Sequence, residues 1–556
     1  MTCAHIGSKM IHRAARFPLL FGLFSALAVQ GCVASDESEG TGVSEDGVYE
    51  HHGLDAYGPV PQNLEDRFVT CPVSDKSKVG TFNGKTYTYK SSAEVRYGAD
   101  GWQDRVTSDW SALSRLVPAN MEAVVIDIRR VGGVPHYLYL SNGKQNTVYE
   151  PWSSSKFMAI SGAMTRARTE SGGKVGGDGT VGNFPIGDMT TAVHTYAAKG
   201  NAPGGGSSGV DGSNGMSNYF FRVAGADYLT ELMHDRWLRL PDRSNFRGGY
   251  GAFSFNEGSL NWTSADGQST TRMGRLETGI NGDKTMSAIA QAEWLKRLTQ
   301  FETDPSTRLP GFNGTIQAED TRALLYGNLK RNNEIGGMLA GESVYLLQGL
   351  LPGIRLGRPD AFGGEPNRAA KDILDRVTGG KWRVFHKLGA GVSGTRNVSE
   401  IVMATYACLP GYDGGREFVI ITSAHASSLA GANTTTQTAF NKLVPLLAPN
   451  FADGSAPPDP TAFPVPTNGR AVATSDSVLK VENVDSSTLP ADGKCAIARG
   501  KALDFLTGAY VNSAKTQVKL TVDPASAAVR ALGCPETVWR GGAVFVHAPH
   551  FTFAPR

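Results

Sequence analysis

Strand-like sequence patterns at both ends of the chain are the feature that most limits its fold. Residues 121–130 and 136–140 are apolar runs separated by the turn-forming segment VGGVP, and they predict a β-hairpin. Two further runs of this kind, residues 381–387 and 417–424, come late in the chain. We therefore expect one sheet that draws its strands from both ends.

Helical patterns occupy the sequence between these runs. Apolar residues three and four positions apart predict helices after Lys156, around 229–237 and over 284–298, and a last helix near 440–447. Strands that are separated by a block of helices favour an α+β fold over an alternating α/β fold. The predicted architecture is an antiparallel sheet flanked by helices, with a helical domain inserted in its middle.

Composition divides the chain into further parts. Its 556 residues predict several domains, and the formal net charge of +2 without a basic block gives no indication of a nucleic-acid partner. A proline-rich stretch, APPDPTAFPVP, predicts a linker before a small β-rich module of unknown role. The predicted divisions are a signal over 1–32, a tether over 33–65, a main domain over 66–450 with a helical part at about 157–375, a linker over 451–466 and the module over 467–556.

The first 32 residues resemble a bacterial lipoprotein signal. Basic residues precede the apolar run FPLLFGLFSALAV, and the segment ends in VQGC at Cys32. We expect Cys32 to carry a lipid and to provide the membrane contact of an exported periplasmic or cell-surface protein. Ordinary signal cleavage beside an incidental cysteine is the alternative.

Four cysteines remain after this segment, and an even number in an exported protein permits disulfides. The pair Cys495–Cys534 is favoured because both residues lie in one terminal segment. Cys71 and Cys408 would then join an early strand to a late one. Four cysteines allow three pairings, and the sequence leaves all three open.

The segment EPWSSSKFMAISG places Ser153 three residues before Lys156 at the start of a helix. A serine hydroxyl needs a base within hydrogen-bond reach to become a nucleophile. Residues i and i+3 face one side of a helix, and a dry lysine has a lowered pKa. The first N–H groups of the helix can stabilise an oxyanion. A solvated serine–lysine pair is the alternative.

The segment HKLGAGVSGTR supplies possible partners. Lys387 ends a predicted strand, Gly389 and Gly391 allow a close approach of the backbone, and Arg396 follows. Such a strand edge can dock a substrate amide, while Lys387 and Arg396 can hold a carboxylate. A glycine-rich turn between strands is the alternative.

Over roughly residues 122–448 the chain resembles the class A serine β-lactamases and the wider family of penicillin-recognising hydrolases. Ser153–Lys156 match the family's S-x-x-K motif, and Lys387–Gly389 match K-[TS]-G apart from the central residue. Asn214 and Asn218 match two asparagines in the helix that follows the S-D-N motif. The segment RLETGIN matches the family's R-x-E-x-x-x-N loop. The resemblance implies a β-lactamase-like fold.

The resemblance also implies a mechanism. Ser153 would form an acyl-enzyme with Lys156 as its base, and the backbone N–H groups of Ser153 and Ala390 would stabilise the oxyanion. Glu277 would activate the water that releases the acid, with Asn281 holding that water. Such chemistry needs no metal or organic cofactor.

Two details of the implied loop stay open. Arg275 and Asp283 would form the ion pair that closes it. Glu257, with Asn261 at the same separation, is an alternative to Glu277.

Two positions depart from the family pattern. Gly212 stands where the family has the serine that relays a proton to the leaving nitrogen, so Ser213, Ser207 or Ser208 must supply that hydroxyl. Leu388 replaces a hydroxyl that helps to bind the substrate carboxylate. A lost buried polar contact costs about 1–3 kcal/mol, so we expect antibiotic lactams to bind poorly.

Three hypotheses follow for a small-molecule or peptidoglycan-derived substrate. The first is a β-lactamase-like serine hydrolase, and the second is a D,D-peptidase or esterase of the cell wall. The third is a catalytically weak envelope-binding protein on the same fold. The first two require that Ser153, Lys156, Glu277, Lys387 and Arg396 come together, and the oligomeric state stays open.

Overall fold

The computed structural model describes part of the chain, and every structural statement below concerns that part. It comprises residues 71, 73–195, 201–205, 209–247, 258–276, 284–308, 316–327, 343–350, 382–393, 396–409, 414–449, 468–473, 476–511, 517–547 and 550–555. None of the helices described is both long and apolar enough to cross a membrane.

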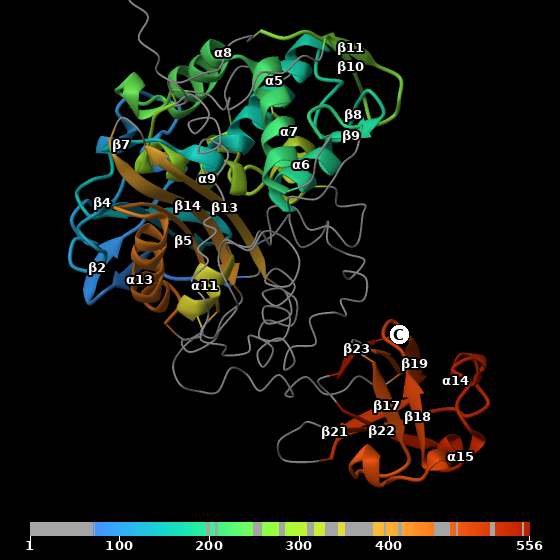
Figure 1. The fold of residues 1–556 in the computed structure, drawn as a ribbon. Helices are drawn as coiled ribbons and strands as arrows, with labels where there is room; N and C mark the ends of the chain where they lie inside the picture. Colours follow the sequence, from blue (N-terminus) through green and yellow to red (C-terminus); the bar gives the residue numbers. More distant parts are fainter. Residues whose placement is uncertain are drawn as a thin grey trace, which may run out of the picture.

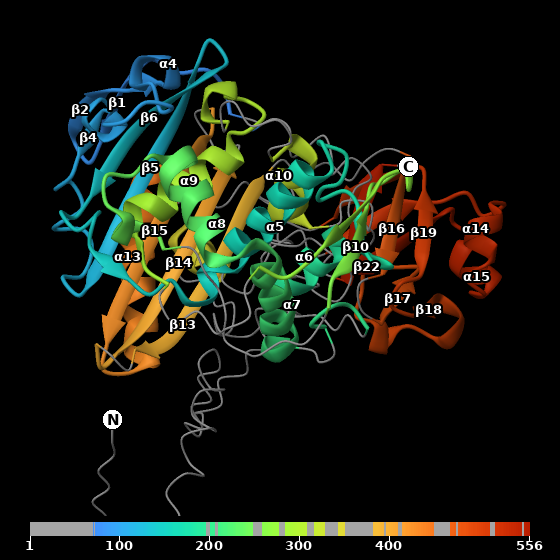
Figure 2. The ribbon, with the colours of Figure 1, turned by 90° about the horizontal axis from the view of Figure 1, so that it is seen from above.

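The main sheet takes strands from both ends of the chain, as predicted. Its strand order is β13-β14-β15-β5-β6-β3, and β4 pairs with β6 as well. Every pairing is antiparallel except that of β4 with β6. Figure 2 shows the long strands side by side. Their bounds are β3 Lys90–Ser91, β4 Ser108–Asp109, β5 Met121–Val131, β6 Val134–Ser141, β13 Arg383–Ser393, β14 Val398–Leu409 and β15 Arg416–Ala426.

Helices cover both faces of this sheet, which explains why its long strands are apolar nearly throughout. Helix α9 (Ala288–Thr299) lies on one face, while α13 (Leu429–Leu447) and α11 (Ser343–Leu350) lie on the other (Figure 1). The strands β5, β14 and β15 are buried over almost their whole length as a result.

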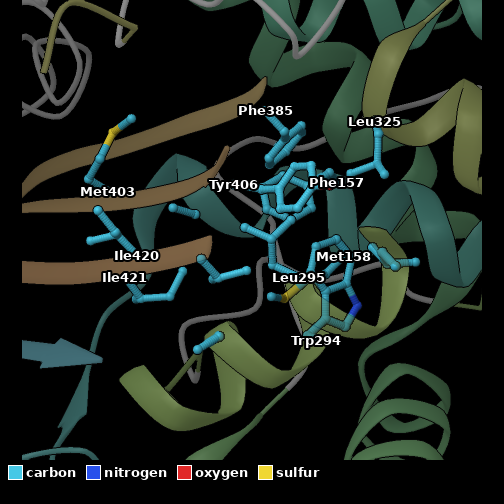
Figure 3. Close-up of a cluster of buried hydrophobic side chains, with 14 of the residues drawn as sticks. Phe157, Met158, Trp294, Leu295, Leu325, Phe385, Met403, Tyr406, Ile420 and Ile421 are labelled. Atoms are coloured by element: carbon cyan, nitrogen blue, oxygen red, sulfur yellow. The ribbon is translucent and has the colours of Figure 1, made fainter. Parts of the chain in front are cut away.

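The helix that follows the serine–lysine pair is anchored in the core (Figure 3). Helix α5 (Lys156–Glu170) inserts Phe157 between a tryptophan of α9 and a phenylalanine of β13. The ring centroid of Phe157 lies 4.5 Å from that of Trp294 and 5.1 Å from that of Phe385. The start of α5 is therefore fixed against both the sheet and α9.

Shorter elements complete this part of the chain. They are β1 Val79–Phe82, β2 Lys85–Thr88, α4 Ser92–Val95, η1 Trp102–Asp104, β7 Val148–Tyr149, η2 Trp152–Ser155, β8 Thr180–Val181, β9 Phe184–Pro185, α6 Ile186–Thr195, α7 Gly209–Ala224, α8 Ala226–Thr230, η3 Glu231–Leu238, η4 Arg243–Asn245, β10 Leu260–Thr263, β11 Thr270–Met273, β12 Met286–Ser287, η5 Pro305–Thr307 and α10 Ala318–Tyr326.

Two predicted boundaries were wrong, and one strand was not predicted. The helix predicted over 284–298 begins at Ala288, because Met286 and Ser287 pair with β7 and the Ser287 side chain caps the helix. The last helix begins at Leu429, where Ser428 caps it, and not near 440. Strand β14 was not predicted, although it joins the two late strands that were.

The C-terminal residues form two antiparallel sheets with a hydrophobic core of their own. The alternating segments QVKLT and AVFVH form β21 and β22 there. The favoured disulfides are confirmed, since Cys495 bonds to Cys534 and Cys71 to Cys408. The bounds are β16 Gly469–Ala473, β17 Ser477–Lys480, η8 Ser486–Thr488, η9 Ala491–Gly493, β18 Lys494–Ile497, β19 Ala502–Phe505, β20 Thr507–Tyr510, β21 Gln517–Thr521, α14 Ala527–Arg530, α15 Glu536–Trp539, β22 Ala543–His547 and β23 Phe551–Pro555.

Candidate active site

Ser153 lies in the single 3₁₀ turn η2, which continues directly into α5. The backbone N–H of Lys156 donates to the carbonyl of Ser153 and closes this turn. Side chains three residues apart eclipse one another in a 3₁₀ turn, so the hydroxyl and the ammonium project on one side. Both are buried, with 4% of Ser153 and 0% of Lys156 exposed.

A chain of buried hydrogen bonds fixes this turn. The Ser154 hydroxyl donates to the carbonyl of Pro151 over 2.5 Å and accepts from Nε2 of Gln291 over 2.9 Å. Oε1 of Gln291 accepts in turn from the Tyr149 hydroxyl over 2.7 Å. Each bond contributes about 1 kcal/mol, and a broken one leaves a buried polar group unsatisfied. The nucleophile turn is therefore held from α9.

Lys156 meets a serine of helix α7. Its Nζ donates to the Ser213 hydroxyl over 2.8 Å, and that hydroxyl donates to the carbonyl of Val193 over 2.8 Å. Of the three candidates for the missing hydroxyl, the structure brings Ser213 to the lysine, while Ser207 and Ser208 lie outside the described residues. This contact joins α5 and α7 at the site.

Strand β13 packs its glycine edge against the nucleophile turn. A Cβ atom on Gly389 would lie 2.3 Å from the carbonyl oxygen of Pro151 and 2.8 Å from the amide nitrogen of Ser154. Only glycine permits this approach. Because β13 is an edge strand, alternate backbone groups point away from β14, and η2 packs on the face of the strand at Gly389 and Gly391. The arrangement suits a strand that docks an amide beside Ser153.

His194 connects the two lysines electrostatically, and the sequence analysis missed it. Burial is the main cause that lowers its pKa to about 3; a hydrogen bond from its ring to the Leu324 carbonyl opposes this, and the charges of Lys387 and Lys156 add to it. The imidazole is consequently neutral at neutral pH. The His194 ring centroid lies 6.5 Å from that of Phe157, which follows Lys156, and 5.6 Å from that of Phe385 on β13, two residues before Lys387. Helix α6 therefore lies beside the elements that carry both lysines.

The other predicted residues in the described part of the chain are buried or paired. Lys387 is fully buried, and its Nζ donates to the carbonyl of Leu388 over 3.1 Å. Arg396 donates from Nη2 to Oε2 of Glu400 over 2.6 Å. Asn214 and Asn218 lie on α7 and are buried.

The predicted deacylation loop is only partly described. Glu277, Asn281, Asp283 and the alternative Glu257 lie outside the described residues. Their roles stay predictions. Arg275 lies inside the described range, and Asn261 is on β10.

The fold and these contacts define a class: an α+β protein that carries a serine–lysine pair at a helix start, beside the edge of a sheet. No protein-family model and no curated protein matches the sequence.

Solved structures do match. TLA-3 extended-spectrum β-lactamase has a TM-score of 0.31 and 12% identity over 59% of this chain and 94% of that chain. A β-lactamase from Xanthomonas campestris has a TM-score of 0.30 and 11% identity over 61% of this chain and 95% of that one. The C-terminal domain of the Bacillus licheniformis BlaR penicillin receptor has a TM-score of 0.27 and 10% identity over 61% and 94%. The candidate site of this chain is assigned from its own contacts.

Proposed function

We propose that this chain is a serine hydrolase that forms an acyl-enzyme on Ser153. Its substrate would be an amide, ester or lactam of a small molecule or of a peptidoglycan fragment. The observation that carries the proposal is the contact of a fully buried Lys156 with Ser213 over 2.8 Å, three residues after a buried serine. Burying an ammonium among polar partners is costly, and such clusters are characteristic of catalytic sites.

Acylation would begin when Lys156, as the neutral amine, accepts the proton of Ser153 and becomes the ammonium, while the serine oxygen attacks the substrate carbonyl carbon. Negative charge develops on the carbonyl oxygen, where N–H groups at the helix start and on strand β13 can stabilise it. The leaving group departs with a proton that returns from Lys156 through the Ser213 hydroxyl. Because that hydroxyl donates to Val193, it must rotate before it can protonate a leaving nitrogen.

Release of the acyl group would use a water activated by Glu277. Removal of this carboxylate should leave acylation intact and make the acyl-enzyme accumulate. A Glu277→Ala variant tests this step by intact mass after a brief exposure to substrate. Unchanged turnover would transfer the role to Glu257 or another base.

The proposal is tested with a fluorescent penicillin and a chromogenic cephalosporin. The wild-type chain should gain one adduct that peptide mapping places on Ser153, and Ser153→Ala should lose both adduct and turnover. Ser155→Ala, which removes another hydroxyl of the same turn, should keep the adduct and serves as the matched control. An adduct at any other residue would refute the assignment of the nucleophile.

A D,D-peptidase or esterase is the second candidate, and one contact favours it. Arg396 already donates to the buried Glu400, and Leu388 brings no hydroxyl, so an anionic lactam finds fewer partners at this end of the site. A stable adduct without turnover, together with hydrolysis of a D-alanyl peptide or a p-nitrophenyl ester, would support this candidate. A chain that reacts with none of the probes would be the envelope-binding protein.

We propose in addition that the chain is exported and anchored through a lipid on Cys32. The motif in the sequence supports this proposal. A Cys32→Ser variant should move from the membrane fraction to the soluble fraction. Equal membrane retention of both forms would contradict the anchor.

A further inference from the structure

Glu400 is a fully buried carboxylate at the start of β14, and three side chains donate to it. Trp152 Nε1 donates to Oε2 over 3.0 Å, and Arg396 Nη2 donates to the same oxygen over 2.6 Å. Nδ1 of His425 lies 3.1 Å from the other oxygen. The sequence analysis did not single out Glu400 or His425.

Strand register explains why one carboxylate reaches the nucleophile turn. Glu400 lies opposite Gly391 of β13 and opposite His425 of β15, so the three residues form a row across the sheet. Gly391 has no side chain, and the Trp152 indole occupies the space above it. A Cβ atom on Gly391 would lie 2.3–2.5 Å from atoms of that ring. The indole thus crosses β13 and ends at Glu400 on the next strand.

Trp152 holds an unfavourable backbone conformation directly before Ser153. Its φ of 50° lies in the left-handed region, which costs a residue with a side chain about 1–3 kcal/mol. Such a conformation persists where surrounding contacts enforce it. The indole contributes two of them, its packing over Gly391 and its hydrogen bond to Glu400.

We propose that Glu400 is a positioning residue for the reaction at Ser153. Through the Trp152 indole it holds the backbone conformation that sets the direction of the Ser153 hydroxyl, and it holds the Arg396 guanidinium with the same oxygen. This inference rests on the proposed acylation of Ser153 and assigns part of the positioning to a residue outside the reacting groups.

His425 balances the charge of this buried row. It lies between Glu400 on β14 and Glu122 on β5, and its Nε2 contacts the carboxylate of Glu122. Lys144 Nζ lies 3.9 Å from the other oxygen of Glu122. Burial, and then the charges of Glu122 and Glu400, raise the pKa of the Tyr149 hydroxyl well above its ordinary value. A buried carboxylate is stable where its hydrogen bonds and neighbouring charges are matched, and the row supplies such partners to both oxygens of Glu400.

The test compares the acylation rate by fluorescent penicillin in the full chain and in three variants. Trp152→Phe keeps an aromatic ring over Gly391 and removes the N–H donor, while Glu400→Gln removes the charge that this donor meets. Because an error of about 1 Å in a reacting group can cost on the order of 100-fold, we expect each variant to acylate 10- to 100-fold more slowly. The double variant should be no slower than the slower single variant, since both remove one interaction.

Glu417 provides the matched control. It is equally buried on β15, but it pairs with Arg130 at the other end of the sheet. Eight residues of strand, at about 3.3 Å each, separate it from His425. Glu417→Gln should lower the melting temperature and leave the acylation rate of the folded protein unchanged.

The outcomes separate this inference from the proposed function. A wild-type chain without an adduct on Ser153 refutes the function and removes the basis for the inference. A wild-type adduct with an unchanged rate in Trp152→Phe and Glu400→Gln overturns the inference alone. Losses that multiply in the double variant, or an equal loss in Glu417→Gln, overturn it as well. If Glu400→Gln does not fold, the rate of Trp152→Phe decides.

Discussion

Replacement of Gly389 by alanine probes the packing of β13 against the nucleophile turn. The added methyl group would lie 2.3 Å from the carbonyl oxygen of Pro151, and ordinary contact begins near 3.4 Å. The strand and the turn must therefore separate by roughly 1.1 Å, since the atoms that the methyl group would meet are the Pro151 oxygen, the Ser154 nitrogen and the Trp152 Cβ, none of which is the end of a flexible side chain. Hydrogen bonds from Gln291 hold the turn, and the pairing with β14 holds the strand, so neither yields without loss.

A separation of this size should lower both the unfolding free energy of the protein and the rate of acylation at Ser153. Overpacking costs typically about 1–3 kcal/mol of unfolding free energy. Misplacement of the strand edge by about 1 Å lowers the acylation rate on the order of 100-fold. Gly541→Ala is the matched control, because a Cβ atom there meets nothing within 4 Å.

Two measurements test this prediction. Urea unfolding gives the stability of each variant, and the rate of adduct formation with fluorescent penicillin is measured in the absence of urea. Gly389→Ala should remain folded and react slowly, whereas Gly541→Ala should match the wild type in both measurements. A folded Gly389→Ala protein that reacts at the wild-type rate would refute the role of the strand edge in acylation.

Four other changes have definite expected outcomes. Ser213→Ala should slow acylation by about 100-fold with little change in stability, and stopped-flow fluorescence against the wild type measures this. Glu417→Gln breaks a buried ion pair and should cost about 3 kcal/mol in urea unfolding; an unchanged midpoint would contradict the pairing. Replacing Cys495 and Cys534 by serine should destabilise the C-terminal module by about 2–5 kcal/mol in calorimetry, while Ser153 still reacts. Burial alone would lower the pKa of His425, but hydrogen bonds from its ring to two carboxylates raise it from 6.5 to about 9. Its stabilising contribution is complete below pH 6.5 and is lost as the pH rises through 9, so the unfolding free energy of the wild type should fall over that window and that of His425→Gln should not.

The long strands and the serine–lysine pair could be predicted because each pattern lies within one short stretch of sequence. The alternation and the apolar runs of β5 and β15 are readable in a single stretch, and so is the spacing of Ser153 and Lys156. The prediction that one sheet takes strands from both ends of the chain followed from the placement of strands before and after the helices. Arguments of this kind do not depend on how distant strands are aligned.

The features that could not be predicted depend on how distant strands are aligned in the sheet. Glu400 is the one charged residue of the apolar strand β14, and its contact with His425 exists only because β14 and β15 pair in a particular register. The shortened start of α9 has the same cause, since β12 pairs with β7. A charged residue inside a long apolar run was the available signal, because a buried charge needs a partner.

The disulfide between Cys71 and Cys408 changes how the chain transmits force. It closes a covalent loop across a sequence separation of 337, and both Ser153 and Lys387 lie inside that loop. Tension applied between a point before Cys71 and a point after Cys408 passes through the sulfur atoms and bypasses everything between them. Stretching of the protein would therefore leave the serine, its lysine and the neighbouring strand edge unloaded until the bond is reduced.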